Sequence, residues 1–219
     1  YAIDAVTCRK LWSHQHDAQG PEMNATNKGI ALAGGRVIRG SQDGFLYALD
    51  AKTGEPLWVR QVADWSIGEG IGAAPTVWND LVYVAKAGGD WGIKGRMMAF
   101  NVADGTLAWS FDLIPTGSET GADTWNPAAS ADHGGGAAWT AYALDRETGT
   151  LFIPVGNPGP DYHSEMRKGA NLFTISTVAI DARTGKLKWW YQLRPNDDHD
   201  WDNTTVTLFD DGGRKLVAT

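Results

Sequence analysis

The chain has 219 residues, and its 19 Lys and Arg against 26 Asp and Glu give a formal net charge of −7. This acidic balance argues against a nucleic-acid-binding protein and against an electrostatic membrane anchor, because both need clustered basic residues. Apolar residues make up 42%, enough for a hydrophobic core. The longest uninterrupted apolar stretches have about five residues, whereas a membrane helix needs roughly 20. A single cysteine excludes an internal disulfide and a metal site of several thiolates.

The most informative feature is a repeat that begins at the first residue. In each copy a short strand ends in Asp or Asn, a turn of the type Asp-x-x-Thr-Gly follows in the clearest copies, and a second strand comes next. In four copies a Trp stands eight residues after the Asp or Asn, and in a fifth Phe152 and Ile153 stand in its place. In chain order the copies are residues 1–12, 47–58, 99–109, 142–153 and 178–189.

The turn chemistry of the repeat explains why the same residue types recur in successive copies. The Asp side chain can bond back to the turn backbone, and the Gly can take a positive φ angle. A second hairpin precedes the repeat most clearly at residues 36–49, around a turn at 41–44. Together these hairpins predict four strands for every 36 to 51 residues, the spacing between successive Asp or Asn positions. That pattern is typical of a β-propeller blade, and a β-sandwich with coincidental turns is the alternative.

The predicted fold class is therefore all-β: a partial β-propeller of four-stranded antiparallel blades. Almost no helix is expected, because no segment has a sustained apolar period of 3.6 residues. The sequence starts and stops within predicted strands. We expect residues 1–219 to be a single segment of about four to five blades within a longer chain.

Insertions between the strands are where a propeller places its chemistry. In chain order they are residues 64–75, 87–95, 114–139, 156–170 and 195–205. The second insertion sets Asp90 among glycines, which lets a ligand or ion approach the backbone, although a solvated loop carboxylate is the plainer explanation. In the third, three glycines lead to Trp139, whose indole could face a flat ligand or belong to the core.

The last two insertions carry oxygen-rich side chains. Asn157 precedes Pro158, which keeps the residue extended and leaves its amide oxygen available as a metal ligand; a turn role is equally plausible. Residues 197–202 include four Asp, and carboxylates this close repel one another. One of them is expected to have a raised pKa or to face a cation, and an acidic surface loop is the alternative. A carboxylate beside a divalent ion would be a plausible general base.

Taken together, these residues resemble the pyrroloquinoline quinone (PQQ) dependent alcohol dehydrogenases of the methanol and ethanol dehydrogenase type. That family folds as an eight-bladed propeller with tryptophan-docking repeats. The motifs that carry the resemblance are residues 27–29, 88–95, 134–139, 156–158, 171–192 and 200–202. The resemblance implies that Trp139 supports the PQQ ring, that Lys28 contacts PQQ, and that Asp90, Asn157 and Asp202 bind Ca²⁺. It also implies that Asp202, which directly follows Trp201, is the catalytic base.

The sequence departs from the family pattern at several of these positions. Asp90 stands in place of the family's Glu, and Lys28 in place of its Arg, which loses a bidentate fork and keeps the charge. Glu22 and Met23 stand where many members have a cysteine pair. Thr204 replaces the extra Asp of lanthanide-using members, so calcium is the expected ion.

The resemblance implies a periplasmic enzyme that oxidises a small alcohol and passes electrons to an acceptor such as a cytochrome c or a quinone. We expect no nucleic-acid partner, and membrane association only through parts outside this chain. A non-catalytic propeller that acts as a periplasmic assembly scaffold is the alternative from another class. A family member that no longer holds PQQ is a third possibility.

Overall fold

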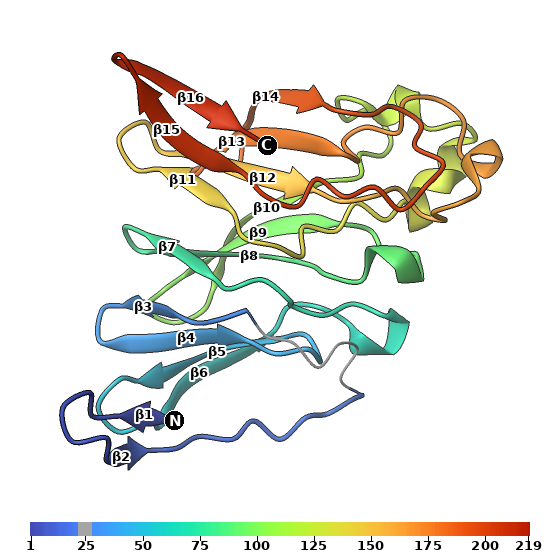
Figure 1. Ribbon diagram of the computed structural model, residues 1–219. Coiled ribbons are helices and arrows are strands. Elements are labelled where there is room, and N and C mark those ends of the chain that lie inside the picture. The colour runs from blue at the N-terminus through green and yellow to red at the C-terminus, as the bar shows by residue number, and fades with distance from the viewer. Residues whose placement is uncertain (22–27) are drawn as a thin grey trace.

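The structure is a computed structural model that describes residues 1–21 and 28–219. Its strands form five antiparallel sheets that follow one another along the chain (Figure 1). The first has two strands, β1 (Ala2–Ile3) and β2 (Lys10–Trp12). The next has four: β3 (Ala31–Ala33), β4 (Arg36–Gly40), β5 (Phe45–Asp50) and β6 (Pro56–Gln61).

Two further four-stranded sheets and a final strand pair complete the series. The third sheet contains β7 (Thr76–Trp78), β8 (Leu81–Ala85), β9 (Arg96–Asn101) and β10 (Leu107–Asp112). The fourth contains β11 (Ala143–Asp145), β12 (Thr150–Val155), β13 (Ser176–Asp181) and β14 (Leu187–Gln192). The last contains β15 (Thr207–Asp211) and β16 (Arg214–Ala218). The predicted partial propeller is confirmed, as three complete blades between two strand pairs.

Helix is confined to short 3₁₀ turns in the described residues, as expected. They are η1 (Trp65–Ile67), η2 (Gly89–Trp91), η3 (Ala122–Thr124), η4 (Ala128–His133) and η5 (Ser164–Met166). Within residues 1–21 and 28–219, none of these helices has the length and apolar character that crossing a membrane requires.

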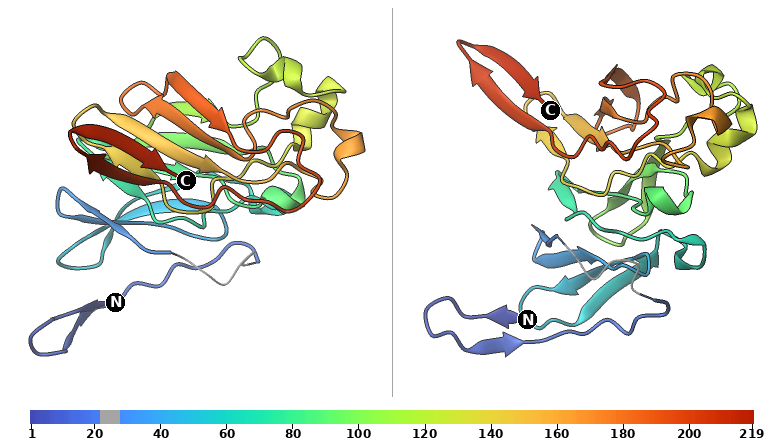
Figure 2. Two further views of the ribbon diagram at one scale, coloured as in Figure 1. Left: turned by 45° about the horizontal axis from the view of Figure 1, so that its top comes forward. Right: turned by 45° about the vertical axis from the view of Figure 1, so that its right-hand side comes forward.

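The blades give the molecule two different ends. The sheets lie one above another in chain order, with the two strand pairs at opposite ends of the stack (Figures 1 and 2). Tight hairpin turns gather on one side of the stack, while the long loops and the 3₁₀ helices gather on the other (Figure 1). Apolar side chains fill the space between successive blades, in one cluster around Ile38 and Val82 and another around Tyr83 and Val178. We call the two sides the turn end and the loop end.

The repeat tryptophans join successive sheets at the turn end. Each indole lies against the glycine of the next sheet's last turn, where an added Cβ would be 2.5–2.7 Å from the ring, and its nitrogen donates to a backbone oxygen at 3.0–3.1 Å. The contacts are Trp12 with Gly54 and Ala51, Trp58 with Gly105 and Val102, and Trp109 with Gly185 and Ala182. The turn glycines therefore serve two purposes, a positive φ angle and a flat surface for the ring.

The expected burial of these tryptophans is only partly confirmed. Trp58 is 7% exposed, and Trp12 and Trp109 are half-buried. The prediction is wrong for Trp189, which is 41% exposed because its ring packs on Phe152 and on no repeat turn among the described residues.

The copy without Trp has a different place in its blade. The other copies form the last hairpin of a sheet, whereas residues 142–153 form β11 and β12, the first hairpin of theirs. The indole of Trp78 on β7 packs against its Gly149, where an added Cβ would be 2.7 Å from the ring. The same turn chemistry thus stabilises both kinds of hairpin.

Candidate active site

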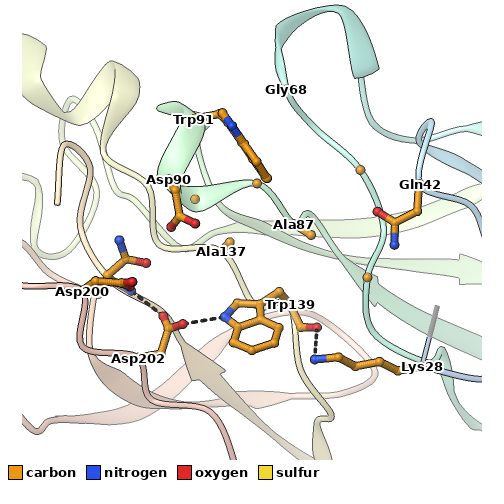
Figure 3. Close-up of a pocket in the computed structure, with 15 residues that line it drawn as sticks. Lys28, Gln42, Gly68, Ala87, Asp90, Trp91, Ala137, Trp139, Asp200 and Asp202 are labelled. Atoms are coloured by element: carbon orange, nitrogen blue, oxygen red, sulfur yellow. Dashed lines mark hydrogen bonds between the residues drawn. The ribbon is translucent and has the colours of Figure 1, made fainter. Parts of the chain in front are cut away.

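The insertions meet at the loop end around a cavity of about 270 Å³ (Figure 3). All five predicted site residues line it, although they lie far apart in the sequence: Lys28 precedes β3, and the other four come from four different insertions. The lining residues are Lys28, Gln42, Gly68, Gly70, Gly72, Ala87, Gly88, Gly89, Asp90, Trp91, Ala137, Trp139, Asn157, Asp200 and Asp202. Glu22 and Met23, which depart from the family pattern, and Asn27 of the motif at residues 27–29 lie outside the described residues.

Glycines make one wall of the cavity from bare backbone. Gly88 has a φ of 109°, and a Cβ there would be 2.1 Å from the carbonyl oxygen of Gly68. A Cβ on Gly70 would be 2.5 Å from the carbonyl oxygen of Gln42. Only glycine allows these loops to approach so closely, so the wall has no side chains to fill the space beside it.

Asp202 is held between two donors from other insertions. The indole Nε1 of Trp139 donates to its Oδ2 at 2.9 Å, and the backbone N–H of Asn157 donates to its Oδ1 at 3.0 Å (Figure 3). Burial raises the pKa of the Asp202 carboxyl, and these two hydrogen bonds oppose the rise. The indole that donates to Asp202 is that of Trp139, whereas the ring of the neighbouring Trp201 is 56% exposed. The carboxylate is thus oriented, partly desolvated and open to the cavity.

Lys28 lies on the face of Trp139. Its Nζ is 3.7 Å from the ring centroid and 3.4 Å from the backbone oxygen of the same residue. Burial lowers the pKa of Lys28, and the charge of Asp202 opposes this. An ammonium over an indole is an attractive cation–π contact. Lys28 is the only Lys or Arg among the described residues that line the cavity, so it is their one basic group for an anionic ligand.

Asn157 is only 2% exposed and belongs to the loop that follows β12. Its Nδ2 donates to Asp161 at 2.5 Å, and its backbone oxygen accepts from Gly136 at 2.8 Å. The amide Oδ1 faces η2, where a Cβ on Gly89 would be 3.6 Å away. Within the described residues no donor reaches this oxygen, which leaves it available as a ligand atom.

The sequence analysis gave no ligand role to two carboxylates at the same place, Asp161, which it did not mark, and Asp200, which it marked only as part of the acidic cluster at residues 197–202. One carboxylate oxygen each of Asp90, Asp161 and Asp200 lies within 4.8 Å of the other two. Burial, followed by the charges of Asp90 and Asp200, raises the pKa of Asp161 to about 6. Asp161 follows Asn157 by four residues, but the sequence offers no period or motif that aims its side chain back at Asn157. Asp202 is not a member of this group of three.

The remaining acidic residues of the last insertion stabilise its loop. Asp197 is fully buried, lies 2.6 Å from Arg194 Nε and accepts the backbone N–H of His199. Asp198 is exposed and pairs with Arg194 and His199. The four aspartates of residues 197–202 therefore divide into two pairs. Asp197 and Asp198 stabilise the loop, and Asp200 and Asp202 line the cavity.

The residues present fit the two groups that the resemblance implies. Calcium prefers carboxylate and amide oxygens, and Asp90 and the unpartnered Asn157 Oδ1 supply them on one wall. PQQ is planar and carries carboxylates, which suits a cavity with two indoles, a bare glycine wall and one cation.

Comparisons with known proteins agree with this geometry. The family model of the glucose, ethanol and alcohol dehydrogenase β-propeller domain, named for PQQ, matches residues 1–214. Quinoprotein alcohol dehydrogenase PedH of Pseudomonas putida is 33% identical over 243 residues, which is 100% of this chain and 40% of the relative. Quinohemoprotein alcohol dehydrogenase from Comamonas testosteroni has a similar structure, with a TM-score of 0.85 at 30% identity over 98% of this chain and 35% of that one. A europium-containing methanol dehydrogenase has a similar structure, with a TM-score of 0.83 at 31% identity over 89% of this chain and 37% of that one.

The chain therefore spans 40% or less of the length of these relatives, at moderate identity along nearly all of its own length. Repeat, cavity and similarity point to one conclusion: the chain belongs to the PQQ β-propeller family of glucose, ethanol and alcohol dehydrogenases.

Proposed function

We propose that the protein oxidises a small alcohol to an aldehyde or ketone, with PQQ and calcium bound in the loop-end cavity. The observation that carries this proposal is the position of Asp202, held by Trp139 Nε1 and Asn157 N at the cavity wall. All three residues come from motifs that also define the family resemblance. A propeller used only as a scaffold would need no such oriented carboxylate inside a glycine-walled cavity.

The proposed chemistry begins with the substrate hydroxyl. Asp202 accepts its proton, and burial favours this role because it raises the carboxyl pKa toward the working pH. When bound, PQQ supplies the two-electron oxidising power. Trp139 offers an aromatic face and Lys28 a positive charge for the carboxylates of the cofactor. Asp90 and Asn157 would hold the calcium ion.

If PQQ stacks on Trp139, Lys28 either stays on one face of the indole or moves off it. Lys28 Nζ covers one face of Trp139, so a flat ligand stacks either on the other face or on a ring that Lys28 has left. An anionic ligand would favour the second course, since the ammonium then exchanges an indole face for a carboxylate. We also propose a periplasmic location and a cytochrome c or quinone as the electron acceptor, on the strength of the family alone.

The test is alcohol-dependent reduction of an artificial electron acceptor by purified protein with PQQ and calcium supplied. Asp202→Asn should lower kcat by roughly 10²–10⁴-fold, the usual contribution of a general base. The matched control is Asp198→Asn, which lies in the same loop outside the cavity and should leave kcat unchanged. Equal losses in the two variants, or full activity of Asp202→Asn at saturating PQQ and calcium, would contradict the assignment.

A further inference from the structure

Three carboxylates at the loop end face one another without a direct ion pair, although the charge of the buried Arg167 acts on one of them, Asp161. Oxygens of Asp90, Asp161 and Asp200 lie within 4.8 Å of one another, and none of the three forms an ion pair with a described Lys, Arg or His. Asp90 and Asp200 also accept no hydrogen bond from a described residue. Like charges at this distance repel, and a cation between them would relieve that repulsion.

The spacing suits a calcium-sized ion. Oxygens that share one Ca²⁺ lie about 2.3–2.6 Å from it, so two of them can be at most about 5 Å apart. The three carboxylates satisfy that limit without movement of the backbone. They also come from three insertions, since Asp90 lies on η2, Asp161 after β12 and Asp200 after β14.

A neutral ligand atom is turned toward the same place. Asn157 is 2% exposed, and its Oδ1 faces the η2 turn that carries Asp90 without receiving a hydrogen bond from any residue in the described ranges. Its Nδ2 donates to Oδ1 of Asp161, which leaves Oδ2 of Asp161 free to bind. An amide oxygen that lines the cavity and has no protein donor is available to a cation.

Asp202, in contrast, has its two oxygens engaged. Trp139 Nε1 and Asn157 N each donate to one of them, at 2.9 and 3.0 Å. A carboxylate held in this way is oriented for proton transfer, and the two hydrogen bonds occupy one acceptor site on each of its oxygens. The ligand set would then need oxygens beyond those of Asp90 and Asn157.

The loop that carries Asp161 is fixed by a buried arginine. Arg167 is 0% exposed and donates to the backbone oxygens of Pro160 and Asp161 at 2.9–3.1 Å, and to Asn171 Oδ1 at 3.2 Å. These bonds hold the backbone at Asp161 in one position. The carboxylate is thus preorganised toward Asp90 and Asp200.

We propose that Asp161 and Asp200 are ligands of the cation at this site, together with Asp90 and the Asn157 amide oxygen, and that Asp202 is left to act as the base. This inference rests on the proposed function in one respect only, that the site holds a cation. It adds to Asp90 and Asn157 two ligands, Asp161 and Asp200, to which the family resemblance gives no role in binding the ion.

The test measures cation binding directly, without PQQ or turnover. Purified protein freed of metal with a chelator is titrated with Tb³⁺, whose luminescence is excited through the nearby indoles of Trp91 and Trp139, and Ca²⁺ is then measured by competition. Asp161→Asn and Asp200→Asn should each weaken Ca²⁺ binding at least about tenfold, because even groups that only orient a metal ligand are worth about 10–100-fold. Asn keeps an oxygen for the Asn157 amide, so Asp161→Asn should still fold, as near-ultraviolet circular dichroism would verify.

Two further variants separate the outcomes. Asp198→Asn, an exposed carboxylate of the same insertion, should leave the Kd for Ca²⁺ unchanged, and Asp90→Asn should raise it. Loss of binding in Asp90→Asn with unchanged binding in Asp161→Asn and Asp200→Asn would overturn the inference and leave the proposed function standing. Calcium binding that depends on Asp161 and Asp200 in a protein that binds no PQQ would sustain the inference and count against the proposed function.

Discussion

Aspartate and tryptophan are used at both the turn end and the loop end, but for opposite purposes. At the turn end, Asp50 accepts the backbone N–H groups of Lys52 and Thr53, and these bonds lower its pKa. At the loop end, burial raises the pKa of Asp202. Tryptophans differ in the same way, because Trp58 donates to a backbone oxygen and Trp139 to a carboxylate. The turn end satisfies its polar groups and stabilises the blades, whereas the loop end leaves charges exposed to one another and to a ligand.

The largest expected effect on stability comes from a turn-end tryptophan. Trp58→Ala removes an indole that is 7% exposed and its hydrogen bond to Val102, so the free energy of unfolding should fall by about 3–5 kcal/mol. Trp201→Ala at the loop end removes a ring that is 56% exposed and should cost less than about 1 kcal/mol. Urea denaturation followed by circular dichroism measures both. A comparable loss in the two variants would erase the distinction between the ends.

A loop-end tryptophan should affect turnover instead. Trp139→Phe keeps an aromatic ring and removes the N–H that donates to Asp202 Oδ2 at 2.9 Å. Hydrogen bonds to charged groups contribute about 1.5–3 kcal/mol, so kcat should fall by about 10- to 100-fold while the unfolding midpoint changes little. Trp58→Phe is the matched control, expected to lower the midpoint and keep kcat. Unchanged kcat in Trp139→Phe would show that this bond has no part in orienting the base.

A turn-end aspartate should matter for folding alone. Asp181 accepts the backbone N–H groups of Arg183 and Thr184 and the Thr184 hydroxyl at 2.9–3.0 Å. An Asp that accepts the N–H groups of a turn acts like a helix N-cap, whose loss costs about 1 kcal/mol, so Asp181→Ala should lower the unfolding free energy by about that amount without changing kcat. Asp198→Ala, whose carboxylate makes only exposed ion pairs, should have a smaller effect on stability. A drop in kcat for folded Asp181→Ala would contradict a purely structural role.

The smallest effect is a pH dependence at the turn end. The Thr148 hydroxyl, with help from Lys215 and the N–H of Glu147, lowers the pKa of Asp145 to about 2. A carboxylate with a lowered folded-state pKa stabilises the fold above its unfolded pKa of about 3.9, and this contribution is lost as the pH falls through about 2. Unfolding midpoints should therefore decline between about pH 4 and pH 2, and less steeply in Asp145→Asn. If the unfolding midpoint falls equally steeply with pH in both proteins, Asp145 does not contribute to the pH dependence of stability.

The sequence predicts the turn end better than the loop end, for a physical reason. Turn chemistry is local: Asp50, Gly54 and Trp58 lie close along the chain, so their spacing reveals the hairpin and its docking ring. Even there, the position of residues 142–153 in the first hairpin depends on pairing with β13, which no local pattern specifies.

The loop end depends on contacts between distant insertions. Its motif residues could be named in advance because the family resemblance carried them, and the structure brings Lys28, Asp90, Trp139, Asn157 and Asp202 to one cavity. Asp161 belongs to no motif, and Asp200 stands in the motif of residues 200–202 only as a neighbour of the expected base; the folded loops bring both beside Asp90. Their roles, like those of the five motif residues, remain predictions for the experiments above.

The most direct test of the proposed function is the absorption spectrum of purified protein titrated with PQQ in the presence and absence of calcium. We expect saturable PQQ binding that shifts the cofactor absorbance, is weakened by a chelator, and is restored by Ca²⁺ in the wild type but not in Asp90→Asn. PQQ that stays unbound at every calcium concentration, or binds equally well with chelator and in Asp90→Asn, would contradict a calcium-dependent quinoprotein site in this cavity.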